Sequence, residues 1–115
     1  MTFQIKRIYE PAEDRDGVRV LVDRIWPRGI SRFDAKISHW EKDVAPTTEL
    51  RRWFGHRPER WAEFRRRYRA ELAHNSAVSE LRKLGRAQSV TLLYGARDVE
   101  HNQARVLLEI LSRRR

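Results

Sequence analysis

Charged and aromatic side chains directly follow two mostly apolar runs, one early in the chain and one late. The run Val18–Val22 is followed by D-R-I-W-P-R-G (residues 23–29), and the run Val90–Tyr94 is followed by G-A-R-D-V-E-H-N (residues 95–102). A carboxylate, guanidiniums and an imidazole in such places could bind an anion or transfer a proton. These two stretches are therefore the candidate functional site.

Asp23 and His101 are the candidate catalytic residues. Asp23 could act as a general base or hold a ribose hydroxyl, and histidine is the side chain that most readily exchanges a proton near neutrality. The alternative for His101 is a hydrogen-bonded structural role. The alternative for Asp23 is a structural ion pair with Arg24, Arg28 or Arg97. Since guanidiniums favour the ionised carboxylate, we expect a lowered pKa for Asp23, which suits a positioning role better than acid catalysis.

The other side chains at the two strand ends could bind an anionic ligand. Guanidiniums pair well with phosphates and carboxylates, and the N-terminus of the last helix would add free N–H groups. Trp26 and Tyr94 could stack on a ring, although such aromatic side chains also commonly cover a core. Asp98 also fits a plain helix N-cap, and Asn102 could orient the ligand. The candidate ligand-binding residues are Arg24, Trp26, Arg28, Tyr94, Arg97, Asp98 and Asn102.

No pattern in the sequence indicates a cofactor or a metal. Gly95-Ala96-Arg97-Asp98 is neither a P-loop nor a dinucleotide fingerprint. The four histidines are scattered without His-Glu-x-x-His spacing and the chain has no cysteine, so we expect no zinc site and no thiolate nucleophile. The Gly-x-Ser-x-Gly motif of α/β-hydrolases is absent as well.

Strands must present the two polar stretches at their ends. The sequence predicts strands over Phe3–Ile8, Val18–Ile25 and Val90–Tyr94, and a short one within Ile37–Lys42. The apolar residues of Val18–Val22 run together instead of alternating, which is typical of a parallel sheet covered on both faces. In such sheets ligands bind beyond the carboxyl ends of the strands, so we expect both polar stretches to line one cleft.

Four helices are predicted in the rest of the chain. Trp61, Phe64, Tyr68 and Leu72 have the spacing of one helical face. The predicted helices begin after Thr47, at Pro58, after Asn75 or Ser76, and after Asp98, with stops at Gly55 and Gly85 and a last helix over Val99–Arg113. This order of elements predicts an α/β fold: a single layered domain over residues 1–115 with a small, mainly parallel sheet flanked by helices.

Composition sets limits on partners and location. The chain of 115 residues carries a formal charge of +9, which attracts polyanions and makes nucleic acid a candidate partner. The arginines of residues 57–69 are interleaved with Glu59 and Glu63, however, so a solvated surface explains them equally well. No apolar run approaches the roughly 20 residues that span a bilayer, and the N-terminus lacks a signal-peptide core. We expect a cytoplasmic protein without a membrane partner.

Four separated blocks resemble the YeaO-like branch of the domain-of-unknown-function 488 family. The blocks are R-V-L-V-D-R-I-W-P-R-G (19–29), W-E-K-D-V-A-P-T-T-E-L-R-R-W-F (40–54), R-W-A-E-F-R-R-R-Y (60–68) and T-L-L-Y-G-A-R-D-V-E-H-N-Q-A (91–104). The resemblance implies a compact, bacterial or archaeal α/β domain, and it implies no established activity. More distant members have a cysteine in an L-L-C-A strand where this chain has Leu92-Leu93-Tyr94-Gly95. A cysteine-based mechanism would therefore not carry over.

Three functions fit these observations. The first is a small enzyme or ligand-binding domain that acts on an anionic, nucleotide-like small molecule at the strand ends. The second is a nucleic-acid-binding module that uses the arginine-rich surface, and the third is a non-catalytic interaction or regulatory protein. The sequence leaves the oligomeric state open.

Overall fold

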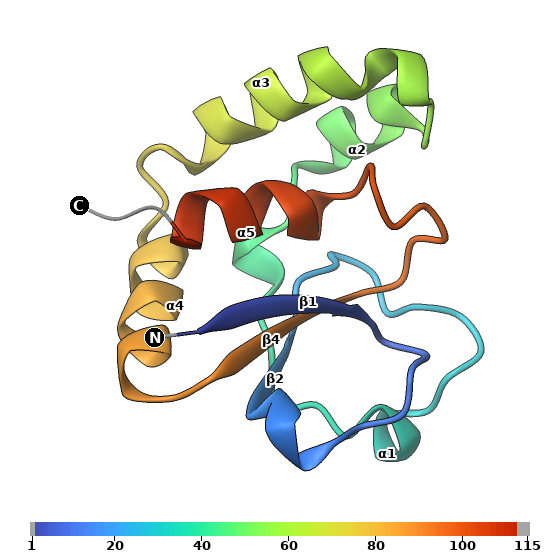
Figure 1. The fold of residues 1–115 in the computed structure, drawn as a ribbon. Helices are drawn as coiled ribbons and strands as arrows, with labels where there is room; N and C mark the ends of the chain where they lie inside the picture. The colour runs from blue at the N-terminus through green and yellow to red at the C-terminus, as the bar shows by residue number, and fades with distance from the viewer. Residues whose placement is uncertain (1, 113–115) are drawn as a thin grey trace.

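Four short parallel strands form the sheet in the computed structural model, which describes residues 2–112 (Figure 1). They are β1 (Phe3–Arg7), β2 (Val18–Leu21), β3 (His39–Trp40) and β4 (Val90–Tyr94), arranged in the order β1-β4-β2-β3. The fully buried β4 pairs with both β1 and β2. Since all pairs are parallel, the carboxyl ends of these strands meet at one edge, as the sequence predicted.

Helices cover mainly one face of this sheet. Five of them lie in the described residues: α1 (Arg32–Ala35), α2 (Thr48–Phe54), α3 (Trp61–Leu72), α4 (Ser76–Ala87) and α5 (Gln103–Ser112). Helix α5 packs on β1 and β4, and α3 packs on the outer side of α5, whereas α1 lies at the opposite face (Figure 1). Two predicted caps are confirmed: Thr47 Oγ1 accepts from the Leu50 N–H at 3.2 Å, and Asn75 Oδ1 accepts from the Ala77 N–H at 2.8 Å.

The strand residues alternate between two apolar clusters. Val20 and Leu92 face the large cluster under α2 to α5, which contains the buried α3 residues Phe64, Tyr68 and Leu72. This confirms the helical face predicted for α3. The smaller cluster on the other face contains Ile8, Leu21, Ala35 and Leu93. Coverage of both faces explains why the apolar residues of β2 run together in the sequence.

A buried ionic network ties the smaller face together. Asp16, only 1% exposed, accepts hydrogen bonds from Lys6 Nζ at 3.0 Å, Arg19 Nη1 at 2.6 Å and the Glu13 N–H at 3.0 Å. Arg19 also donates to the Ala35 carbonyl at 2.8 Å. Burial acts to raise the pKa of Asp16, but these donors outweigh it and leave the pKa below its ordinary value. The network joins β1, β2 and α1.

Two predicted boundaries at the candidate site are wrong. The strand predicted over Val18–Ile25 ends at Leu21, so residues 22–25 are loop rather than strand. The last helix starts at Gln103 and not at Val99. Asp98 accepts from the Glu100 and His101 N–H groups of the preceding turn, and Asn102 Oδ1 accepts from the Arg105 N–H at 3.1 Å. Asn102, and not Asp98, therefore caps α5.

Other predicted boundaries differ as well. Helix α4 continues through Gly85 to Ala87, because Gly85 serves close packing: a Cβ there would lie 2.2 Å from Cζ of Phe3. The strand predicted within Ile37–Lys42 is reduced to the two residues of β3. The predicted end of the last helix, Arg113, lies outside the described residues. Within residues 2–112, no helix has the length and apolar character needed to cross a membrane.

Candidate functional site

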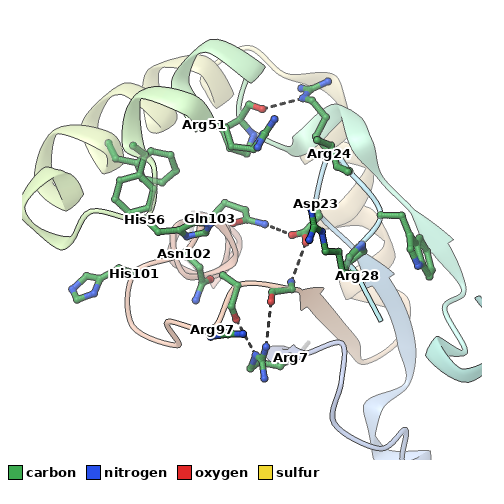
Figure 2. Close-up of a pocket in the computed structure, with 18 of the residues that line it drawn as sticks. Arg7, Asp23, Arg24, Arg28, Arg51, His56, Arg97, His101, Asn102 and Gln103 are labelled. Atoms are coloured by element: carbon green, nitrogen blue, oxygen red, sulfur yellow. Dashed lines mark hydrogen bonds between the residues drawn. The ribbon is translucent and has the colours of Figure 1, made fainter. Parts of the chain in front are cut away.

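A cavity of about 750 Å³ opens at the carboxyl ends of the strands (Figure 2). Its walls come from six parts of the chain: the end of β1 with Tyr9, residues 23–28 after β2, residues 95–97 after β4, the start of α5, α2 with its flanking residues, and Phe64 of α3. The two stretches predicted to share a site therefore line one cavity. This volume lies within the range of small-molecule sites.

Asp23 lies in the middle of the cavity wall (Figure 2). Its Oδ2 accepts a hydrogen bond from the Gly95 N–H at 3.0 Å, and its Oδ1 accepts from Gln103 Nε2. Burial raises the pKa of Asp23 to about 6, although both hydrogen bonds and the charge of Arg51 act to lower it. The predicted lowered pKa is wrong, because only neutral groups donate to this carboxylate.

The predicted ion pair of Asp23 with a neighbouring arginine does not form, because those arginines point elsewhere. Arg24 donates to the carbonyls of Pro46 at 3.0 Å and Ala45 at 3.2 Å, which fixes the segment before α2. Arg7 similarly donates to Ala96 O at 2.9 Å and Gly95 O at 3.3 Å. Both side chains line the cavity, and each uses two of its nitrogens to hold the cavity walls in place.

Three other arginines line the cavity. Arg28 and Arg97 are exposed at its rim, and within residues 2–112 neither side chain makes a hydrogen bond or ion pair. Arg51 is partly buried, and its Nε is the one buried side-chain polar atom of the described residues that lacks a hydrogen-bond partner. With Arg7 and Arg24, five arginines and a single carboxylate line the cavity, so its field is positive.

The aromatic walls differ from those expected. Trp26 lines the cavity, but its indole donates to Ile30 O at 2.7 Å and packs edge-on against Trp40. Tyr94 does not line the cavity: it is 3% exposed within the large apolar cluster. Phe54 and Phe64 line it instead, with ring centroids 4.3 Å apart.

The residues before α5 are mostly engaged with one another. His101 lines the cavity, its Nδ1 lies 2.9 Å from Asp98 Oδ2, and its ring packs edge-on against Trp61. Asp98 lies outside the lining. Asn102 lines it and is 2% exposed, but its oxygen caps α5 and its nitrogen donates to Asp98 O at 2.9 Å. Asp23 and His101 thus share a cavity without a hydrogen bond between them.

Several residues that line the cavity were not predicted from the sequence. Most of them lie in or beside helices and not directly after a predicted strand. Arg51 and Phe54 are spaced i, i+3 on α2, a signal that one helical face meets the cavity. His56 follows Gly55 in a second left-handed conformation, with φ of 58°, which no residue pattern indicates. The missed lining residues with polar or aromatic side chains are Arg7, Tyr9, Arg51, Phe54, His56, Phe64 and Gln103. In the described part of the chain, no three His, Asp or Glu side chains gather to hold a metal ion.

Comparison with protein families identifies the chain. The model of a family described as "Inactive DUF488-N3 subclade" matches residues 2–115. The chain belongs to the DUF488 family. The resemblance noted in four sequence blocks is thereby confirmed.

Bacterial relatives match 96% of the DUF488 chain. An uncharacterized protein of Mycobacterium tuberculosis (strain H37Rv), Rv3073c, is 47% identical over 111 residues, which cover 96% of this chain and 94% of the relative. The uncharacterized protein YeaO of Escherichia coli K12 is 45% identical over 112 residues, which cover 96% of this chain and 97% of the relative. No solved structure matches the chain.

Proposed function

We propose that this DUF488 chain is a non-catalytic binding domain for a small anionic ligand, which it holds at the carboxyl ends of the sheet strands. The observation that supports this most directly is the charge of the cavity: five arginines line it against one carboxylate. A phosphate or carboxylate entering it would meet the exposed guanidiniums of Arg28 and Arg97 at the rim.

Binding without catalysis is favoured by two observations. The matching family is described as inactive. In addition, the candidate acid and base are not coupled, because His101 is engaged with Asp98 while Asp23 accepts from Gly95 and Gln103. Asp23 and His101 are therefore proposed as binding residues, and an enzymatic role is the alternative.

The experiment is isothermal titration of the protein with inorganic phosphate, ribose 5-phosphate and citrate, with ribose as the neutral comparison. We expect binding of at least one anion and none of ribose, with affinity that falls as salt increases. Arg97→Gln and Arg28→Gln should each weaken binding about tenfold, the effect of one charge-assisted hydrogen bond.

Arg86→Gln is the matched control, because Arg86 is exposed on α4, outside the cavity, and its loss changes the net charge equally. If no anion binds, or if all three variants weaken binding equally, the cavity is not an anion site and the proposal fails. Turnover of any bound compound would favour the enzyme alternative.

The arginine-rich helix gives the nucleic-acid hypothesis less support than its sequence suggests. Arg66 and Arg67 both pair with Glu63, at 2.7 Å each, while Arg65 and Arg69 pair with Glu109 at 2.8 and 3.2 Å. The hypothesis stays a prediction, and an electrophoretic shift assay at increasing salt tests it. The cytoplasmic location belongs to the proposal in the same way, and localisation of a tagged chain tests it.

A further inference from the structure

Within residues 2–112, the partly buried carboxylate of Asp23 makes no ion pair. Its Oδ2 accepts from the Gly95 N–H at 3.0 Å and its Oδ1 accepts from Gln103 Nε2, and both donors are neutral. Burial raises its pKa to about 6, because these donors do not offset the loss of solvent. A carboxylate held in one orientation at such a cost, in the wall of a cavity, is a common property of binding sites.

This carboxylate keeps acceptor positions that a ligand can use. Each oxygen accepts one hydrogen bond from the protein, whereas an ionised carboxylate offers about four acceptor positions. Asp23 lines the cavity and is only partly buried, so solvent can reach the remaining positions. A ligand that fills the cavity displaces this solvent, and an acceptor left without a donor weakens binding. The ligand should therefore carry hydrogen-bond donors as well as an anionic group.

The two exposed arginines of the rim begin close to the same carboxylate. A Cβ on Gly95 would lie 3.0 Å from Asp23 Oδ2 and 3.0 Å from Pro27 Cβ, so Asp23 and Pro27 both border Gly95. Arg28 follows Pro27, and Arg97 comes two residues after Gly95. Because consecutive Cα atoms are about 3.8 Å apart, the Cα of each arginine lies at most about 8 Å from that of Pro27 or Gly95. One small molecule can therefore reach both Asp23 and these guanidiniums.

The charges of the cavity determine the kind of donor. Five arginines and one carboxylate line it, so its field repels a cationic donor such as an ammonium group. Hydroxyl groups donate without a charge, and two neighbouring hydroxyls can reach the two oxygens of one carboxylate. We propose that the ligand is a phosphorylated sugar whose hydroxyl groups donate to Asp23 and whose phosphate binds Arg28 and Arg97. This rests on the proposed function and names its ligand class.

Isothermal titration at pH 8, where Asp23 is ionised, tests this with two phosphates that differ only in hydroxyl groups. Ribose 5-phosphate carries them, and tetrahydrofurfuryl phosphate has the same five-membered ring and phosphate without them. We expect ribose 5-phosphate to bind at least about tenfold more tightly, as for hydrogen bonds to a charged group. Asp23→Asn should lose most of this preference. It should bind tetrahydrofurfuryl phosphate at least as tightly as the natural protein does, because a negative charge beside the phosphate is removed.

Arg97→Gln should give the complementary result, because Arg97 is assigned to the phosphate that both compounds share. It should weaken the binding of both compounds by the same factor and leave the ratio of their affinities unchanged. The matched control for Asp23→Asn is Asp34→Asn, since Asp34 is exposed on α1, does not line the cavity, and changes the net charge equally. This control should keep the ratio of the natural protein.

Equal affinities for the two phosphates in the natural protein, or an unchanged ratio in Asp23→Asn, overturn the sugar inference and leave the anion site standing. Tighter binding of 2-aminoethyl phosphate than of ribose 5-phosphate overturns it as well, because the donor to Asp23 would then be a cation. If neither phosphate nor any other anion binds, both this inference and the proposed function fail.

Discussion

Two carboxylates flank β2, and their surroundings are opposite. Asp16, just before the strand, is 1% exposed and accepts from the cations Lys6 and Arg19. Asp23, two residues after the strand, accepts from the neutral donors Gly95 N–H and Gln103 Nε2. The pKa of Asp16 is lowered and that of Asp23 is raised to about 6. The charge of Asp16 is paired with cations of the protein. Asp23 lines a cavity, and its hydrogen bonds do not offset the free-energy cost of burying its charge.

Substitution of Asp16 should have the largest effect. Asp16→Asn removes the charge that pairs with Arg19, whose side chain is 5% exposed and would remain as a buried, uncompensated cation. We expect the free energy of unfolding to fall by about 3–5 kcal/mol, measured by urea titration at pH 7. Asp14→Asn, at an exposed position of the same turn, should change it by less than about 0.5 kcal/mol. Equal effects of the two substitutions would contradict the structural role of Asp16.

Substitution of Asp23 should have the opposite sign. Its pKa of about 6 in the folded state exceeds its ordinary value of 3.8, so the folded protein binds the proton more tightly, and ionisation between pH 4 and 7 destabilises it. Asp23→Asn lacks this penalty. The variant should gain about 3 kcal/mol relative to the natural protein between pH 4 and 7, since one pKa unit corresponds to about 1.4 kcal/mol. Urea titrations across this range measure the gain, and a constant difference would refute the raised pKa.

Asp16 should show the reverse pH dependence. A lowered folded-state pKa means that its stabilisation is present above the ordinary pKa of 3.8 and disappears as the pH falls through the folded value. The difference in unfolding free energy between the natural protein and Asp16→Asn should therefore shrink in acid below pH 4. Urea titrations down to pH 2 measure it, and a difference that widens in acid would exclude this assignment.

The glycines beside the two carboxylates extend the comparison. A Cβ at Gly17 would lie 2.3 Å from the Ser89 carbonyl oxygen, at a φ of +66°, whereas a Cβ at Gly95 would lie 3.0 Å from Asp23 Oδ2. Gly17→Ala should destabilise the protein by more than Gly95→Ala, for which we expect about 1–2 kcal/mol. Thermal unfolding measures both. A larger cost at Gly95 would mean that the Asp23 end of β2 is the more rigid one.

Arg97→Gln should have the smallest effect on stability. The side chain is exposed and makes no hydrogen bond within residues 2–112, so the free energy of unfolding should change by less than about 0.5 kcal/mol while anion affinity falls. Urea titration beside calorimetric binding separates the two effects. A stability loss above 1 kcal/mol would indicate a structural role for Arg97 instead.

The sequence predicted the parallel sheet and the place of the site because both depend on local patterns. The apolar run of β2 indicated burial on both faces, and the polar residues after β2 and β4 marked the cavity. Helix caps such as Thr47 could also be predicted, since the N–H group that donates to the cap lies only three residues away in the chain.

The partners of each side chain were not predictable in this way. Asp23 follows β2 among arginines, yet its partners are Gly95 and Gln103, more than 70 positions away. Arg51 and Phe54 reach the cavity only because α2 is packed beside it. The sequence predicted Asp98 as the N-cap of the last helix, but Asn102 caps it. Both residue types suit an N-cap, and only tertiary packing selects between them. Sequence spacing therefore located the site, but it predicted a lowered pKa for Asp23 where the pKa is raised.

The strand order has a consequence for how the protein is made. Because β4 lies between β1 and β2, the first two strands do not pair with each other. Strand β1 can pair only after β4 has been synthesised, since Phe3 is paired with Val90. Pairing over such a separation is slow, and unpaired strand edges promote aggregation. Until β4 is synthesised, the nascent chain therefore lacks the partner of β1 and one of the two partners of β2. Truncation before residue 90 should yield an insoluble chain rather than a smaller folded one.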